Sequence, residues 1–364
     1  MVDLHAAFAA DYGEARDKFT AAAGARSLSV ERYEHPTARG ARGEALSMDV
    51  ALLGNTDAPA MLLVTSAMHG VEGFAGSGCQ VALLQDDSVR AAIAESGVAV
   101  LFCHAVNPYG FSHLRRANED NVDVNRNFRD FSQPLARNDA YASLHAMLVP
   151  DEWPPGSSNT EALKTSAARY GLARLQAIIT SGQSEFPDGL FYTGRAPTWS
   201  NVSLREMLAR HGQGRRALGW IDIHTGLGSW GHGEKIYNGP DEQATLARAK
   251  AWYGIDVTTF YDGTSTSAAL TGVAYHAAVE TCPAARFTGI GLEFGTRPLT
   301  ETLQALRGEQ WLTNHPSAPE ALRLAIKRQM RDAFFDESIA WQALVYGQTR
   351  VAVLQGVRAL AQEP

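Results

Sequence analysis

The chain has little cysteine and no excess of positive charge. Its 364 residues include only three cysteines, Cys79, Cys103 and Cys282, with no C-x-x-C spacing. This excludes a disulfide scaffold and argues against a cysteine-based metal site, so each is expected to be a small buried apolar residue. The formal net charge of −7 argues against nonspecific binding to nucleic acid or to an anionic membrane surface. We therefore expect neither as a partner, and the oligomeric state stays open.

Long hydrophobic runs are also absent. Every apolar run is broken within about ten residues, too short for a membrane span. The first residues carry acids and lack the apolar segment of a signal peptide, and residues 1–19 predict an amphipathic helix instead. With 45% hydrophobic and 20% charged residues the chain is globular rather than disordered. These features predict a cytoplasmic protein.

Four apolar segments predict buried strands at residues 60–67, 98–106, 218–223 and 289–294. Continuous apolar runs are typical of strands covered on both faces. Helical patterns lie between them, at residues 76–84, 88–94, 161–179 and 202–210. The alternation predicts one α/β domain over residues 1–364, with a mixed, mostly parallel central sheet flanked by helices. Residues 129–216 form a long, lid-like insertion in it, and residues 300–364 are C-terminal helices.

Each predicted strand leads to polar residues. His69 and Glu72 follow the first strand, Asn107 the second and His224 the third, while Glu293 lies inside the fourth. In open α/β sheets, ligands gather beyond the carboxyl ends of the strands, so these residues should converge on one crevice.

His69 and Glu72 form an H-x-x-E pair, a weak metal signal by itself. A hydrolytic zinc site commonly takes three protein ligands and leaves a position for water, and His224 is the natural third ligand. Imidazole and carboxylate suit zinc, without excluding cobalt or manganese. Nearby glycines allow close backbone approach, namely Gly70, Gly73 and Gly226.

Four motifs carry a resemblance to a known family. HGVEG, RANEDNVDVNRNF, DIHTG and GLEFGT follow one another between Met61 and Thr296. In this order they resemble the M14 zinc carboxypeptidase superfamily, and more narrowly its bacterial DUF2817 branch. The resemblance implies a zinc carboxypeptidase-like fold with one zinc ion per chain.

The resemblance also implies the roles of the metal site. His69, Glu72 and His224 would hold zinc, which polarises the scissile carbonyl and lowers the pKa of its water to about 7. Glu293 would be the general base that takes a proton and returns it to the leaving amine. Arg116 would stabilise the developing oxyanion, with the adjacent Arg115 as the alternative.

Further positions match groups that bind substrate. Asn125 and Arg126 match the pair that holds a terminal carboxylate, which a guanidinium can bind in a bidentate manner. Asp123 matches the acid that orients a zinc-binding histidine, expected to be His69. Tyr261 and Tyr275 compete for the place of the tyrosine that covers the substrate, and neither lies in a clean motif.

These residues predict a zinc-dependent hydrolase that cleaves an amide bond next to a free carboxylate, as a carboxypeptidase does, on small peptides. The alternative is a deacylase of N-acyl amino acids, like the aspartoacylase and succinylglutamate desuccinylase relatives. A third reading, of another class, is an inactive relative that binds carboxylates. The motifs do not separate the first two, because both use the same metal and base.

Overall fold

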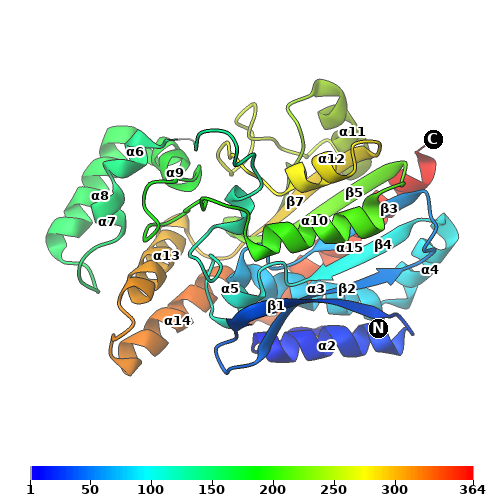
Figure 1. Cartoon of the computed structure of the whole chain (residues 1–364), viewed down its shortest axis with the longest axis horizontal. Coiled ribbons are helices and arrows are strands. Elements are labelled where there is room, and N and C mark those ends of the chain that lie inside the picture. Colours follow the sequence, from blue (N-terminus) through cyan, green and yellow to red (C-terminus); the bar gives the residue numbers. More distant parts are fainter. Residues whose placement is uncertain (1, 136, 364) are drawn as a thin grey trace.

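A seven-stranded sheet runs through the molecule, in the spatial order β1-β2-β4-β3-β5-β7-β6 (Figure 1). The computed structural model describes residues 2–135 and 137–363. The strands are β1 (Val30–Arg39), β2 (Ala45–Leu53), β3 (Ala60–Thr65), β4 (Ala99–His104), β5 (Ala217–Trp230), β6 (Gly233–Tyr237) and β7 (Arg286–Gly295).

The sheet confirms the predicted α/β class. Strands β4, β3, β5 and β7 are parallel neighbours in the centre, and they are the four strands that the sequence predicts. Strands β1, β2 and β6 add antiparallel pairs that the sequence pattern did not predict. Strand β1 is an edge strand in which half of the residues are exposed and four of the ten are charged, a composition that protects an edge and hides the strand pattern.

Strand β3 shows why its sequence is apolar throughout. Leu62 and Val64 belong to the core on one face of the sheet, and Met61 and Leu63 to the core on the other. Successive side chains of a strand point to opposite faces, so a sheet covered twice needs apolar residues at every position. Fully burying one such side chain stabilises the fold by about 1.5–3 kcal/mol.

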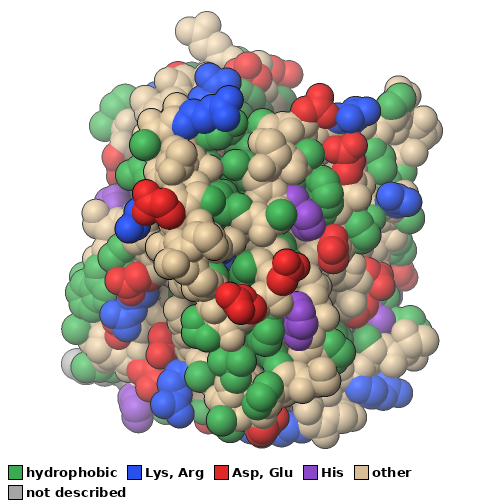
Figure 2. Space-filling view, turned by 90° about the vertical axis from the view of Figure 1, so that its left-hand side faces the viewer, with side chains coloured by type: hydrophobic (Ala, Val, Ile, Leu, Met, Phe, Trp, Pro, Cys, Tyr) green, Lys and Arg blue, Asp and Glu red, His purple; other side chains and the backbone are tan. Residues whose placement is uncertain are grey.

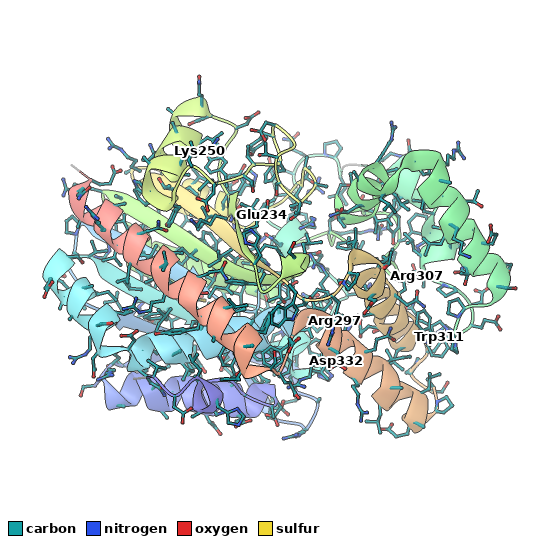
Figure 3. All side chains as sticks on the ribbon, turned by 180° about the vertical axis from the view of Figure 1, so that it is seen from behind. Glu234, Lys250, Arg297, Arg307, Trp311 and Asp332 are labelled. Atoms are coloured by element: carbon teal, nitrogen blue, oxygen red, sulfur yellow. The ribbon has the colours of Figure 1, made fainter. Side chains whose placement is uncertain are left out.

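Helices cover both faces of the sheet. Those that contribute to the first core include α1 (Leu4–Ala7), α2 (Tyr12–Ala25), α3 (Gly73–Gln85), α4 (Asp87–Ser96), α11 (Gln243–Tyr253) and α15 (Ile339–Gln362). The second core is covered by α10 (Trp199–Gly212) and α12 (Tyr275–Thr281). Helix α15 crosses the back of the sheet in Figure 3.

Two predicted helices are each divided in the structure. The single helix expected in residues 1–19 is replaced by α1 and α2, each with its own aspartate cap, Asp3 and Asp11. The helix expected at residues 161–179 is broken into α8 (Ser157–Tyr170) and α9 (Leu172–Thr180). At the break Gly171 has φ 76° and ψ 152°, a conformation that glycine adopts readily and that ends a helix.

The expected insertion, residues 129–216, has two parts. Helix α10 packs on the sheet, whereas α6 (Asp139–Ala142), α7 (His145–Leu148), α8 and α9 lie at one end of it, beside α13 (Leu299–Asn314) and α14 (Glu320–Phe334) (Figure 1, left). Figure 2 shows this end, where acidic, basic and apolar side chains are interspersed. Among the helices of the described residues, none is both long and apolar enough to cross a membrane.

Arg307 of α13 joins the insertion to the C-terminal helices (Figure 3). Its side chain is buried and donates hydrogen bonds to the carbonyl oxygens of Met147 and Leu148, at 2.9 and 3.2 Å, and to the side chain of Asn159. The guanidinium of Arg307 replaces the water molecules that these buried carbonyl oxygens would otherwise bind. Helix α13 thereby holds the insertion in place.

Replacing Arg307 by alanine should loosen the insertion, because buried carbonyls lose their donor at a cost of about 1–3 kcal/mol each. We expect limited proteolysis within residues 137–185 to become severalfold faster, and the melting temperature to fall. Arg90→Ala, which removes an exposed arginine of α4, is the matched control. Equal cleavage rates in the two variants would contradict the anchoring role.

Candidate metal centre

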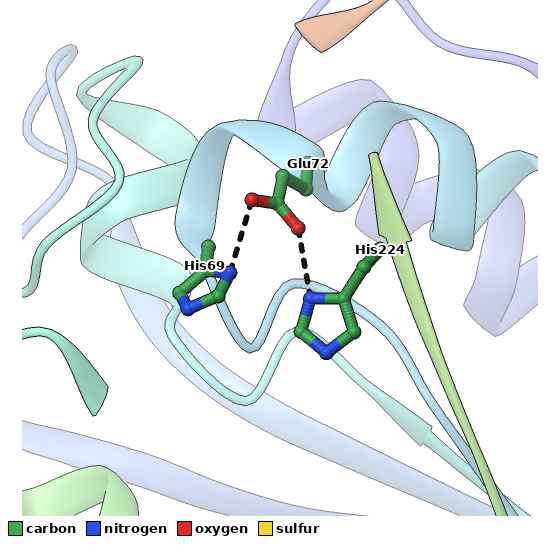
Figure 4. A group of neighbouring side chains, drawn as sticks. All are labelled: His69, Glu72 and His224. Atoms are coloured by element: carbon green, nitrogen blue, oxygen red, sulfur yellow. Dashed lines mark hydrogen bonds and ion pairs between the residues drawn. The ribbon is translucent and has the colours of Figure 1, made fainter. Parts of the chain in front are cut away.

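Three side chains able to bind a metal lie together beyond β3 and in β5 (Figure 4). His69 precedes the short turn η1 (Gly70–Glu72), which ends in Glu72, and His224 lies in β5. The Nδ1 atom of His69 is 3.0 Å from one carboxylate oxygen of Glu72, and Nδ1 of His224 is 2.9 Å from the other. One possible ligand atom from each residue lies within 4.8 Å of the others, and all three side chains are buried.

His224 is a strand residue, whereas the sequence places it after a strand. Strand β5 continues beyond it to Trp230, and His224 pairs in register with Glu293 of β7. Paired residues of neighbouring strands share a face of the sheet. The candidate base therefore lies on the same face as one of the metal ligands.

A carboxylate also lies next to the second ring nitrogen, Nε2, of each histidine. Nε2 of His69 lies 3.1 Å from Asp123, and Nε2 of His224 lies 2.7 Å from Asp222. Both ring nitrogens of each histidine therefore face a carboxylate, and Nε2 of His69 also lies 2.7 Å from the guanidinium of Arg116. A metal held by Nδ1, beside Glu72, would leave Nε2 to donate to its aspartate. Such carboxylates fix the orientation of metal-binding imidazoles.

Glycines let the turns approach closely. A Cβ atom on Gly70 would lie 2.0 Å from the backbone of Gly110, in α5 (Pro108–Ser112). Gly226 has φ +117°, and a Cβ there would meet the ring of Phe334 at 2.7 Å. Neither position accepts a side chain without displacing the ligand next to it.

Electrostatics keep the cluster ionised. Burial alone would raise the pKa of Glu72, but the charges and hydrogen bonds of His69 and His224 hold it well below its usual value. Burial would lower the pKa of His224, whereas Asp222 and Glu72 raise it well above the usual value. Two oriented imidazoles and one carboxylate, without a thiolate, are a donor set that fits zinc.

Glu293 faces the same site from β7. One of its carboxylate oxygens accepts a hydrogen bond from the backbone of Leu227 at 3.0 Å, and the residue is 9% exposed. Burial and the negative charge of Glu72 raise the pKa of Glu293 above its usual value. A carboxyl with a pKa nearer to neutrality is suited to accept and return a proton.

The structure distinguishes the two neighbouring arginines. Arg116 points into the cluster, with Nε 3.0 Å from Asp123 and Nη1 3.2 Å from Glu72. Arg115 turns away and forms an ion pair of 2.9 Å with Glu309 of α13, which Lys327 of α14 also contacts. Arg116 is thus the arginine within reach of the metal site, and Arg115 attaches this loop to the C-terminal helices.

Asn125 and Arg126 belong to the turn η2 (Val124–Arg126). Arg126 is buried, and its Nε and Nη2 donate to the carbonyl of Thr180, at the end of α9, at 2.9 and 2.8 Å. Burial lowers the pKa of Arg126 to about 10. The amide oxygen of Asn125 accepts a hydrogen bond from the backbone of Ala274 at 2.9 Å, which fixes its orientation.

Most of the predicted site residues line one cavity with an empty volume of about 1250 Å³, its open mouth included. The predicted site residues in its lining are His69, Glu72, Arg116, Asn125, Arg126, His224 and Glu293. The two tyrosines are not brought to it. Tyr261 is 38% exposed and donates to the carbonyl of Gly239, and Tyr275 is buried at the start of α12. The tyrosine in the lining is Tyr237 of β6.

Two contributors to the site were missed in the sequence. Asp222 precedes His224 by two residues in a strand, a spacing that places both on one face and could have identified the pair. Phe191 lies in the insertion, with its ring 4.9 Å from the guanidinium carbon of Arg116 and 5.9 Å from that of Arg126. No local pattern in the sequence signals this contact.

Two solved structures share the fold, and a third matches with a lower TM-score. Thrombin-activatable fibrinolysis inhibitor matches with 11% identity and a TM-score of 0.54, over 97% of this chain and 75% of the other. The bovine inhibitor, in complex with a tick carboxypeptidase inhibitor, matches with 11% identity and a TM-score of 0.51, over 97% of both chains. Carboxypeptidase A from Helicoverpa armigera matches with 14% identity and a TM-score of 0.45, over 89% and 73%.

The sequence also matches a family model. Residues 8–348 match the family described as "Protein of unknown function (DUF2817)". The chain belongs to this family, which confirms the predicted resemblance to DUF2817, and the likeness to the solved structures shows the fold. No curated protein matches the sequence.

Asp222→Asn should weaken zinc binding, because the amide neither stabilises the His224 imidazole by charge nor holds its tautomer. Loss of such a partner typically costs about 10–100-fold in metal affinity. Competition with a chromogenic chelator measures the change. Asp256→Asn, which alters an exposed carboxylate paired with Lys235, is the control. Zinc affinity equal to wild type would show that Asp222 has no part in the site.

Proposed function

We propose that the protein is a zinc-dependent hydrolase that cleaves an amide bond next to a free carboxylate, as a carboxypeptidase does. The observation that carries the proposal is the gathering of seven polar residues from five separate segments of the chain in one cavity. They are His69, Glu72, Arg116, Asn125, Arg126, His224 and Glu293.

One zinc ion per chain would be held by His69, Glu72 and His224, whose donor atoms are already oriented toward one another. When bound, zinc supplies a Lewis acid that polarises a carbonyl and makes water more acidic. Asp123 and Asp222 keep the imidazoles in the required tautomer by accepting their Nε2 protons.

The remaining groups handle the proton and the developing charge. Glu293 takes a proton from the attacking water and delivers it to the leaving amine nitrogen, since it lines the same cavity as the candidate metal ligands. Arg116 supplies a fixed positive charge for the oxyanion that forms on the scissile carbonyl. Both groups are held in place before the reaction, which limits the reorganisation that it requires.

Arg126 and Asn125 would bind the free carboxylate. The Arg126 guanidinium bonds to neutral carbonyls, and its closest carboxylate oxygen, Oδ1 of Asp123, lies 4.0 Å away. That oxygen also faces His69, and the other oxygen of Asp123 pairs with Arg116. Two guanidinium groups share this one acid with His69, so a substrate carboxylate adds a favourable counter-charge. The site therefore attracts an anion although the whole chain has a net charge of −7.

Two alternatives keep this site. A deacylase of N-acyl amino acids needs the same metal, base and carboxylate pocket as a peptidase. An inactive relative that only binds carboxylates would have no chemical use for Glu293 beside the metal ligands. The retained base favours a hydrolase over the inactive relative.

Glu293→Gln tests the hydrolase. The variant should bind one zinc per chain and bind substrate, yet lose about 100-fold or more of kcat, because the amide cannot take the proton. Zinc content by metal analysis, with turnover of short peptides and N-acyl amino acids, gives both readouts. Removal of zinc from the wild type should abolish turnover, and added zinc should restore it. Zinc loss in the variant, or full turnover without metal, would refute these roles.

Arg126→Lys tests the carboxylate pocket. Lysine keeps the charge but cannot form the bidentate contact, so we expect KM to rise about tenfold or more with a smaller change in kcat. A substrate whose terminal carboxylate is replaced by an amide is the control, since it should discriminate little between wild type and variant. An unchanged KM for the free carboxylate would remove Arg126 from substrate binding.

A further inference from the structure

The cavity has two chemically different parts. In the described chain, the charged side chains of its lining come from the turns and strands at the sheet edge. The lining side chains from α9 and α13 carry no charge, and six of them are aliphatic. These six, which we name the aliphatic wall, are Leu172, Leu175, Ile179, Leu299, Leu303 and Leu306.

The aliphatic wall consists of one face from each of two helices. Its members recur every three or four residues along α9 and along α13, which places them on one side of each helix. Leu172 is 64% exposed and Leu299 38% exposed, so the outer part of the wall is open to solvent. Aliphatic side chains gathered on a cavity that also holds a reactive centre are typical of a binding site for an apolar group.

The wall begins at the charged part and leads away from it. The last residue of α9, Thr180, accepts the hydrogen bonds of Arg126, and Leu172 lies about 12 Å further along the helix at 1.5 Å per residue. Helix α13 begins at Leu299, six residues after Glu293. The wall therefore lines the same cavity as the carboxylate pocket and the base, and Leu172 is its most exposed member.

Polar residues of the two helices also line the cavity, namely Gln176, Thr180, Thr300 and Thr302. Gln176 of α9 lines the cavity, but its amide donates to the carbonyl of Thr266, at 3.0 Å. A peptide laid along the wall would bury its amide groups against aliphatic side chains, an unfavourable transfer without hydrogen-bond partners. An aliphatic chain has no such groups, and each methylene buried there improves binding by about fourfold.

Building on the proposed function, we propose that the substrates are N-acyl amino acids with a medium or long aliphatic acyl chain. The amino acid carboxylate binds Arg126, and the acyl chain lies along the aliphatic wall. Hydrolysis breaks the amide C–N bond: the acyl carbon takes the oxygen of water and becomes a carboxylic acid. The nitrogen takes a proton and leaves as the free amino acid.

A chain-length series tests this proposal. N-acetyl-, N-octanoyl- and N-dodecanoylalanine, each below its micelle concentration, are compared with alanyl dipeptides on the zinc-loaded enzyme. We expect kcat/KM to rise by about 50-fold or more from acetyl to dodecanoyl, because part of each added methylene is buried. Calorimetric binding of the same series to zinc-loaded Glu293→Gln should show a parallel rise in affinity.

Wall variants locate the effect. The double variant Leu172→Gln/Leu299→Gln changes two exposed leucines, so folding is not at risk. It should lower the dodecanoyl-to-acetyl ratio of kcat/KM by about tenfold. Leu324→Gln, at a leucine of α14 that is 59% exposed and outside the cavity, should keep the wild-type ratio.

The outcomes separate this inference from the proposed function. Hydrolysis that is independent of chain length, or faster for dipeptides than for acyl amino acids, overturns the inference and leaves the hydrolase standing. If the zinc-loaded protein hydrolyses no member of the series, the proposed function fails. The binding series then decides the inference, since affinity that rises with chain length supports the aliphatic site and flat affinity overturns it.

Discussion

The site depends on the burial of one carboxylate. Glu72 is 1% exposed, and its two oxygens are divided between His69 and His224, with a further hydrogen bond from the backbone of Thr225 at 3.2 Å. A buried carboxylate is costly unless charged groups and donors surround it. Because these partners follow β3 and lie in β5, satisfying Glu72 requires the end of β3 to lie beside His224 in β5.

The two histidines in turn have charged partners on the side away from Glu72. Each imidazole that faces Glu72 is held from behind by an aspartate, and Asp123 also pairs with Arg116. The loop that carries Arg116 is attached to α13 through the ion pair of Arg115 with Glu309. The C-terminal helices lie far from Arg116 in sequence. They nevertheless stabilise the position of this side chain, which we propose to take part in the reaction.

The cavity owes its division into charged and aliphatic parts to the origin of its walls. The ends of the strands and the turns after them provide the polar side chains. Their backbone groups lack some hydrogen-bond partners, and their side chains face the crevice. Helices α9 and α13 provide aliphatic ones, since each packs its apolar side toward the molecule. A chain with a net negative charge therefore contains a local site for a ligand that has one anionic group and is otherwise apolar.

Local patterns in the sequence were enough for the central strands, since a strand buried on both faces must be apolar at every position. They were also enough to select His69, Glu72 and His224, because few residue types bind metal and glycines accompany them. Edge strand β1 was not predicted, because its charged residues reflect exposure to solvent. They do not show the apolar pattern of a strand that contributes to a core. The break at Gly171 escaped because one glycine can lie within a helix or end it.

The sequence by itself determined the fold class, the family and the candidate ligands, because each of these depends on residue types and short spacings. Only the tertiary structure decided between Arg115 and Arg116 and kept Tyr261 and Tyr275 out of the cavity lining. It also turned the aliphatic faces of α9 and α13 toward the metal centre. These outcomes depend on which distant segments meet, and residues more than 100 positions apart leave no local signal of their contact.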